Sequence, residues 1–183
     1  MITLKSPREI EGMRQSGAII AGMHQGLRDI IKPGISTWEI ETFSRDYIES
    51  HGGRAAQIGF EGYEYATTVS VNNEVAHAFP RKQLFLKEGD IVTVDTVVDL
   101  NGYYSDSAWT YAVGEVSPEV QRLMDVAKRA MYIGIEQAQV GNRLGDVGAT
   151  INAYVEDENG FGNVRDYVGH GIQPTMHEDP SVF

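Results

Sequence analysis

The sequence predicts an α/β (α+β) fold, with an internally duplicated antiparallel sheet, flanking helices and a second half that is incomplete within 183 residues. Three observations lead to this expectation. Capping signals mark helix starts, an Asn-Gly pair separates two strand-like runs, and similar segments recur 107 residues apart. The length suits one hydrophobic core. Residues 1–183 are therefore expected to form a single domain that lacks its C-terminal third.

Four helices are expected from caps and from the spacing of apolar residues. Ser6-Pro7-Arg8-Glu9 places serine at the N-cap, proline at the first helical position and glutamate at the third. Ser36-Thr37-Trp38-Glu39 repeats the capping box. Apolar residues at helical spacing follow each signal. The four helices are expected to begin after Ser6, after Ser36, after Ser117 and at about Asp146.

A β-hairpin is expected between the second and third helices. Ile91–Leu100 is rich in β-branched residues, and Tyr103–Val113 follows directly after Asn101-Gly102. An Asn-Gly pair between two such runs is the strongest short-range hairpin signal. A two-residue loop would place Leu100 opposite Tyr103 and so fix the register of the whole hairpin.

An internal repeat explains why the second half should be incomplete. Pro33-Gly34, Tyr47-Ile48-Glu49 and Gly53 recur as Val140-Gly141, Tyr154-Val155-Glu156 and Gly160, each 107 residues later without a gap. The counterpart of the hairpin would fall near positions 202 to 213, beyond the last residue. The sequence is therefore expected to be truncated.

The hairpin register brings two carboxylates to one face of the sheet. Asp95 should lie opposite Ala108 and Asp106 opposite Val97, and residues two apart on a strand share a face. Diagonal neighbours are roughly 7–8 Å apart at Cα. Paired metal ions about 3.5–4 Å apart relieve such repulsion and are a recurrent hydrolytic device. The alternative is that both aspartates are exposed on a solvated sheet face.

The five histidines fall into two groups. His24 and His51 lie within or at the end of helices and are expected to be solvated or capping residues. His77, His170 and His177 lie in segments marked by glycine or proline, where side chains with functional roles are often held. Of His170 and His177, one would ligate metal while the other hydrogen-bonds substrate, and the spacing does not decide which; the alternative is that such loop histidines are structural.

Composition limits the function further. The net charge of −11 and the pI near 4.8 argue against nucleic acid or anionic membranes as partners. The absence of cysteine excludes disulfides and thiol catalysis. The N-terminus carries no signal-like apolar region, and no run approaches the roughly 18 apolar residues of a membrane span. A cytoplasmic location is the expectation.

Four segments together resemble the type I methionine aminopeptidases of peptidase family M24, which have the pita-bread fold. The resemblance extends over essentially the whole chain, and the four segments follow one another at the family's spacings. They are Val69–His77, Val94-Asp95 with Ser105-Asp106-Ser107, Val168–Ile172 and His177–Pro180.

The resemblance implies a site residue by residue. Asp95 would chelate one metal ion, Asp106 would bridge two, and His170 would bind the other. His77 and His177 would orient the substrate and stabilise its tetrahedral intermediate. The residues that match the pocket for the methionine side chain are Phe60, Tyr63, Thr68 and Met176.

The resemblance also implies an activity and its requirements. The enzyme would use two divalent ions (Co, Mn, Fe or Zn) to remove the initiator methionine from nascent polypeptides, as at the ribosome, when the second residue is small. It would bind neither nucleic acid nor membrane, and the complete protein would be a monomer. Two glutamates of the family's site, including the general base, would lie beyond Phe183, so the activity of this chain is expected to be impaired.

Two other functions remain open at this point. A proline dipeptidase of the same fold is disfavoured because such relatives carry an additional N-terminal domain, whereas only 94 residues precede Asp95. A non-enzymatic binding module of the pita-bread fold is disfavoured because such modules usually lose the metal positions, whereas Asp95, Asp106 and His170 are all present.

Overall fold

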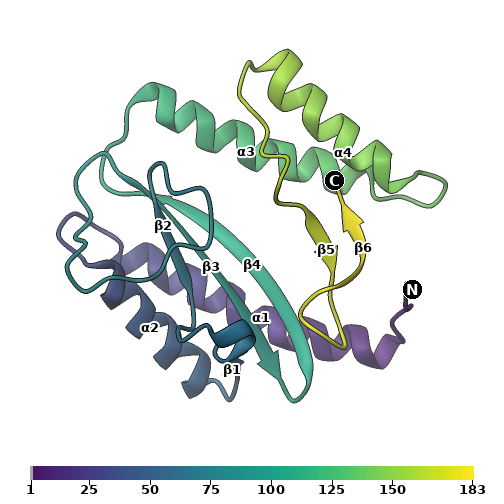
Figure 1. Ribbon diagram of the computed structural model, residues 1–183, viewed down its shortest axis with the longest axis horizontal. Helices are drawn as coiled ribbons and strands as arrows, with labels where there is room; N and C mark the ends of the chain where they lie inside the picture. Colours follow the sequence, from purple (N-terminus) through teal and green to yellow (C-terminus); the bar gives the residue numbers. More distant parts are fainter. Residues whose placement is uncertain (1) are drawn as a thin grey trace. The chain divides into compact units, whose positions relative to one another are not determined.

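A computed structural model describes residues 2–183, which form two compact units (Figure 1). The sheet unit consists of Thr3–Val116 and Ile172–Met176. The helix-pair unit consists of Ile2, Ser117–Gly171 and His177–Phe183. The expectation that residues 1–183 form a single domain stays a prediction.

The sheet unit is built around one long strand. Strand β3 pairs antiparallel with β4 along one edge, and with β1 and β2 along the other. Helix α1 packs on β3 and β4, while α2 contacts α1, β1 and β2. The elements are α1 (Pro7–Ile30), α2 (Thr37–Ser50), β1 (Arg54–Ala55), the 3₁₀ turn η1 (Phe60–Gly62), β2 (Thr68–Val71), β3 (Ile91–Leu100) and β4 (Tyr103–Ala112).

The two faces of the β3–β4 hairpin have different environments. Val92, Val94 and Val98 face the helices and are fully buried. They join Met23 and Leu27 of α1 in the main hydrophobic core. Side chains alternate between faces along a strand, so the odd-numbered residues of β3, among them Asp95, lie on the face away from α1.

The predicted helix starts are confirmed in the sheet unit. The Ser6 side chain accepts a hydrogen bond from the Glu9 amide, and the Glu9 carboxylate accepts one from the Ser6 amide at 2.7 Å. Ser36 and Glu39 form the same reciprocal pair at the start of α2. Each box satisfies amides that have no partner within the helix.

The helix-pair unit repeats the helix–loop–helix arrangement of α1 and α2. Helix α1 ends at Ile30 and α2 begins at Thr37, and α3 ends and α4 begins 107 residues later. Ser117 caps α3, as predicted. The elements are α3 (Pro118–Gln137), α4 (Leu144–Asn152), the π-helical turn η2 (Ala153–Glu158), β5 (Gly169–Gly171) and β6 (Glu178–Val182).

The predicted start of the fourth helix at Asp146 was two residues late. The helix begins at Leu144, and Asp146 is its third residue. The Asp146 carboxylate accepts a hydrogen bond from the Arg143 amide at 2.7 Å. In a capping box the acidic residue is the third residue of the helix, and its carboxylate accepts a hydrogen bond from the amide of the N-cap residue. Asp146 has this role, so the helix begins before it.

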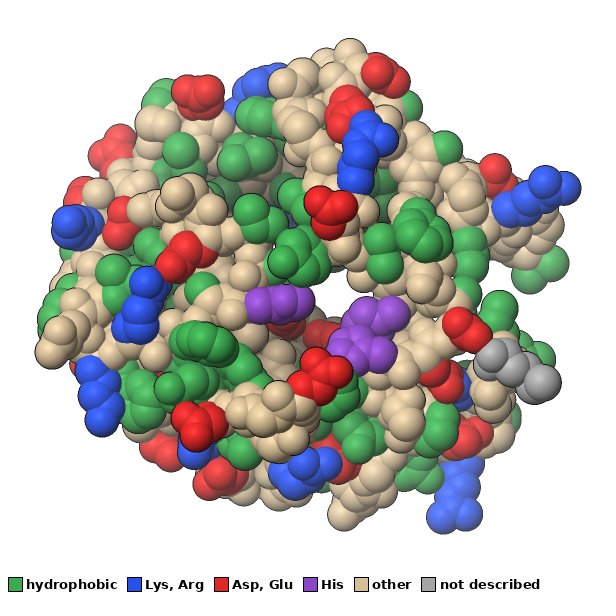
Figure 2. All heavy atoms as spheres, in the orientation of Figure 1, with side chains coloured by type: hydrophobic (Ala, Val, Ile, Leu, Met, Phe, Trp, Pro, Cys, Tyr) green, Lys and Arg blue, Asp and Glu red, His purple; other side chains and the backbone are tan. Residues whose placement is uncertain are grey.

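On the face shown in Figure 2, acidic and basic side chains are interspersed, and the excess of acid is not gathered into one patch. Within residues 2–183, no helix combines the length and apolar character needed to cross a membrane.

Candidate metal centre

The hairpin brings Asp95 and Asp106 together on one face. Asp95 pairs with Ala108 and Val97 pairs with Asp106, which is the predicted register. The Asp106 carboxyl group is near enough to raise the pKa of Asp95. The prediction that they lie on one face of the hairpin is therefore confirmed, and that face is the one away from α1.

The electrostatics of this pair fit a cation. Asp95 is half-buried and Asp106 is exposed. The pKa of Asp95 is raised to about 7, first by burial and then by the negative charge and hydrogen bond of Asp106. The alternative expectation, that both aspartates are exposed on a solvated sheet face, therefore does not hold for Asp95. Burial and mutual repulsion both disfavour two ionised carboxylates at this place. A divalent metal ion bound by their oxygen atoms would relieve both costs.

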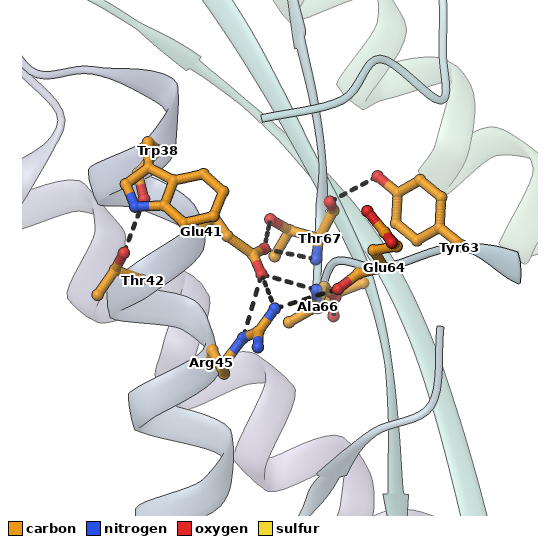
Figure 3. Close-up of polar contacts among 9 residues, drawn as sticks. Trp38, Glu41, Thr42, Arg45, Tyr63, Glu64, Ala66 and Thr67 are labelled. Atoms are coloured by element: carbon orange, nitrogen blue, oxygen red, sulfur yellow. Dashed lines mark hydrogen bonds and ion pairs between the residues drawn. The ribbon is translucent and has the colours of Figure 1, made fainter. Parts of the chain in front are cut away.

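The segment before β2 carries candidate pocket residues and is held by a buried carboxylate (Figure 3). Glu41 of α2, only 1% exposed, accepts hydrogen bonds from the amides of Ala66 and Thr67 at 2.8 and 2.9 Å. Arg45 lies 2.8 Å from the same carboxylate. The hydroxyl of Tyr63 donates to the carbonyl of Thr67 at 2.8 Å. This network fixes the path of the chain into β2.

Two of the candidate pocket positions are set by this network. Thr68 is the first residue of β2 and pairs with Asp95, so the two share a face of the sheet. Tyr63 is half-buried beside the same segment, and burial raises its pKa. Phe60 begins the turn η1, where its side chain is exposed.

His77 is held beside β2 in a strained conformation. The Val69 amide donates to the Ala78 carbonyl at 2.9 Å, and the Ala78 amide donates to the Ser70 hydroxyl at 3.3 Å. His77 itself is exposed and has a φ of 59°. Non-glycine residues in this region are uncommon and concentrate at functional sites. The sheet unit therefore contains His77, Thr68 and both aspartates.

Met176 packs on the same face of the hairpin as the aspartates. It is buried against Ala56 and Val97, and Val97 pairs with Asp106. The Gln173 side chain ties this segment to the hairpin: it accepts from the Tyr104 amide at 3.0 Å and donates to the Gly102 carbonyl at 2.9 Å.

His170 and His177 form a second pair, within the helix-pair unit. His170 is in β5 and His177 directly precedes β6, and these two strands pair antiparallel. The two ring centroids are 4.4 Å apart at an interplanar angle of 66°. The structure thus brings the carboxylates together and the histidines together, each pair in its own unit. Neither unit, over residues 2–183, gathers three or more His, Asp or Glu side chains that could hold a metal ion.

Comparison with known proteins decides the family. The profile of metallopeptidase family M24 matches residues 11–183. Methionine aminopeptidase 1 of Bacillus subtilis is 42% identical over 182 residues, covering 100% of this chain and 73% of that protein. The chain belongs to the M24 metallopeptidases.

Other relatives within family M24 agree. The methionine aminopeptidase of Clostridium acetobutylicum is 43% identical, covering 100% of this chain and 72% of that protein. The crystal structure of a methionine aminopeptidase from Thermotoga maritima superimposes with a TM-score of 0.96 at 41% identity, over 100% of this chain and 73% of the other. The resemblance to methionine aminopeptidases and the pita-bread fold class are both confirmed.

More distant M24 proteins share the fold alone. An X-Pro aminopeptidase from Thermotoga maritima has a TM-score of 0.81 at 19% identity, and covers 98% of this chain but 49% of its own. The higher sequence identity to methionine aminopeptidases, over the whole of this chain, disfavours the proline dipeptidase reading.

Sequence reasoning misjudged one histidine and overlooked two polar anchors. His24 was expected to be solvated or capping, but it is fully buried between α1 and β4. His51 does cap α2, with Nδ1 2.8 Å from the Tyr47 carbonyl oxygen. Glu41 and Gln173 were not predicted to anchor site segments, because their partners lie 25 and 69 residues away in sequence.

Proposed function

We propose that this chain carries the site of a methionine aminopeptidase that removes the initiator methionine from nascent polypeptides whose second residue is small. The observation that carries the proposal is the Asp95–Asp106 pair on one face of the hairpin, in a chain matched to family M24 over residues 11–183. Nascent chains emerge from cytoplasmic ribosomes, which places the proposed activity in the cytoplasm.

Each site residue has a proposed role. Asp95, Asp106 and His170 would hold two divalent ions: Asp95 would chelate one, His170 would bind the other, and Asp106 would contribute to both. When bound, the ions supply Lewis-acid chemistry that makes hydroxide available near neutral pH. Cobalt, manganese, iron and zinc all accept oxygen and imidazole donors.

The histidines outside the proposed ligand set act on the substrate. His77 and His177 would hydrogen-bond the carbonyl of the first peptide bond, where negative charge develops during attack. An exposed imidazole on a strained backbone, as at His77, is a suitable donor for this purpose.

The methionine side chain needs an apolar pocket close to that carbonyl. Four residues of the sheet unit would line it, and they supply aromatic, methyl and thioether surfaces. Met176 and Thr68 lie on the aspartate face of the sheet. The proposed pocket residues are Phe60, Tyr63, Thr68 and Met176.

The test compares the chain with Asp106→Asn. Mn²⁺ binding is measured by calorimetry, and methionine release is followed from two peptides that begin Met-Ala and Met-Trp. We expect the substitution to weaken Mn²⁺ binding at least tenfold and to abolish any metal-dependent release from the Met-Ala peptide, because it removes the bridging charge. Asp46→Asn, which removes the charge of an exposed aspartate on α2, is the matched control. Equal Mn²⁺ binding by Asp106→Asn and the unaltered chain would overturn the proposal.

A further inference from the structure

Two polar side chains lie in the apolar face that α1 turns toward the hairpin. Ser16 and His24 are both 0% exposed, among Ile20, Met23 and Leu27. Burying a hydroxyl or an imidazole costs free energy unless its hydrogen bonds are satisfied. Neither residue has a role in the proposed chemistry, so their hydrogen-bond partners indicate what they do.

Ser16 joins α1 to both strands of the hairpin. Its hydroxyl donates to the Val98 carbonyl of β3 at 2.9 Å and lies 2.8 Å from the Ser105 hydroxyl of β4. Val98 and Ser105 are partners across the hairpin. One side chain therefore fixes the strand pair immediately before Asp106.

His24 holds β4 immediately after Asp106. Its Nε2 lies 3.2 Å from the Ser107 carbonyl oxygen, and its Nδ1 lies 2.7 Å from the Tyr111 hydroxyl. Burial lowers the pKa of His24 to about 4, so the ring is neutral at pH 7 and carries one N–H. Nε2–H can then donate to Ser107, while Nδ1 accepts from Tyr111.

Trp109 completes the contact. The His24 and Trp109 rings stack with centroids 4.8 Å apart and an interplanar angle of 1°. Trp109 Nε1 donates to the Ser107 hydroxyl at 3.0 Å. The carbonyl and the hydroxyl of Ser107 are thus both held from the helix side of the sheet.

Ser105 and Ser107 flank Asp106, and their side chains alternate with it between the two faces. Fixing both neighbours fixes the Cα–Cβ direction of Asp106, whose carboxyl group meets Asp95 on the opposite face. We propose that Ser16 and His24 are positioning residues that aim the Asp106 carboxylate for metal binding. This inference rests on the proposed metal function. Hydrogen bonds made directly to a ligating side chain commonly change metal affinity by 10–100-fold when they are removed. Ser16 and His24 act through the neighbours of Asp106, so the lower end of that range is expected for them.

The experiment separates the hydrogen bond of His24 from its ring. His24→Phe keeps an aromatic ring against Trp109 but loses the donor to Ser107, whereas His24→Gln keeps an N–H near the Nε2 position but loses the ring. Mn²⁺ affinity of the 183-residue chain is measured by calorimetry, and the geometry of bound Co²⁺ by its visible absorption spectrum. We expect His24→Phe to bind Mn²⁺ on the order of tenfold more weakly, with an altered Co²⁺ spectrum. His24→Gln should restore both.

Two further variants keep the test decisive if His24→Phe fails to fold. Ser16→Ala removes the hydroxyl on the other side of Asp106 and should weaken Mn²⁺ binding several-fold. Ile20→Val, on the same helix face, should lower the melting temperature by a few degrees without changing Mn²⁺ affinity.

The outcomes distinguish this inference from the proposed function. If the unaltered chain binds Mn²⁺ but Ser16→Ala and folded His24→Phe bind it equally well, the positioning role is overturned and the metal function stands. If Ile20→Val weakens Mn²⁺ binding as much as they do, the effect is one of general stability and the positioning role is likewise overturned. If the unaltered chain binds no Mn²⁺, both proposals fall.

Discussion

The helix pair α1–α2 and the helix pair α3–α4 have the same spacing along the chain and different surroundings. In the sheet unit, α1 and α2 contact the four-stranded sheet, and Met23, Leu27 and Ile40 are 0% exposed. In the helix-pair unit, α3 packs on α4 and η2, and the positions 107 residues after Met23 and Leu27 are Ala130 and Gly134, which are buried but small. The larger Leu123 and Met131 of α3 are 40% and 51% exposed. The same amphipathic pattern therefore contributes very different amounts of apolar burial.

Polar residues show the same contrast. Glu41 of α2 is a buried anchor for the segment before β2, but 107 residues later α4 has Gly148. A Cβ atom at Gly148 would collide with the carbonyl of Phe183. Position 41 thus needs a long acceptor, and position 148 needs no side chain. The comparison shows that an internal repeat preserves backbone layout while the residues facing each partner diverge.

The largest effect expected from this comparison is on core packing. Leu27→Ala should lower the free energy of unfolding by about 2–5 kcal/mol, because it leaves a cavity in a fully buried site. Leu123→Ala, on the corresponding face of α3, should change it by less than about 1 kcal/mol. Urea unfolding followed by circular dichroism measures both. Equal losses would show that the two helix faces are packed alike.

Buried His24 should make the stability of the sheet unit depend on pH. Its pKa is lowered from 6.5 to about 4 by burial, so between these values the unfolded chain binds a proton that the folded chain does not. The contribution of His24 to stability should therefore be complete above pH 6.5 and fall as the pH drops toward 4, by about 3 kcal/mol at most. Asp95 contributes in the opposite direction, because its raised pKa favours the folded chain as the pH falls, so the His24 contribution is the difference between the profiles of the unaltered chain and His24→Phe. Urea unfolding at pH 7, 5.5 and 4.5 tests this, with His24→Phe as the control that should lose part of the pH dependence. An identical pH profile in that variant would contradict the assignment.

Glu41→Gln should cost about 2 kcal/mol. The amide keeps one acceptor oxygen but loses the charge that faces Arg45, and its NH₂ group would oppose the donors at Ala66 and Thr67. Thermal unfolding measures the loss. Glu49→Gln is a surface control on the same helix, since Glu49 is exposed, and a similar loss in both variants would show that the Glu41 network contributes little.

The smallest effect is expected at the surface of the helix-pair unit. Arg165 lies 2.7 Å from Glu156, but its side chain is 69% exposed. Solvent screens such pairs, and most contribute little. Arg165→Ala should leave the melting temperature unchanged within error in 0.15 M salt. A clear drop would mean that this ion pair helps to hold the segment after η2.

Much of the fold followed from short-range signals in the sequence. The boxes at Ser6 and Ser36 and the cap at Ser117 act within four residues of each helix start, and Asn101-Gly102 determines the register of twenty strand residues. That register was sufficient to place Asp95 and Asp106 on one face. The start of α4 was misplaced because an acidic residue can occupy either the cap or the third helical position.

Local patterns did not determine which polar residues are buried. A histidine in an amphipathic helix can face solvent or core, and His24 is buried because Ser107 and Tyr111, more than 80 residues away, supply its partners. Glu41 and Gln173 depend in the same way on distant backbone groups. Turn and cap energies arise between neighbours and can be read from sequence. The hydrogen bonds that satisfy a buried polar group form only once distant strands and helices pack together, and so only the tertiary structure decides them.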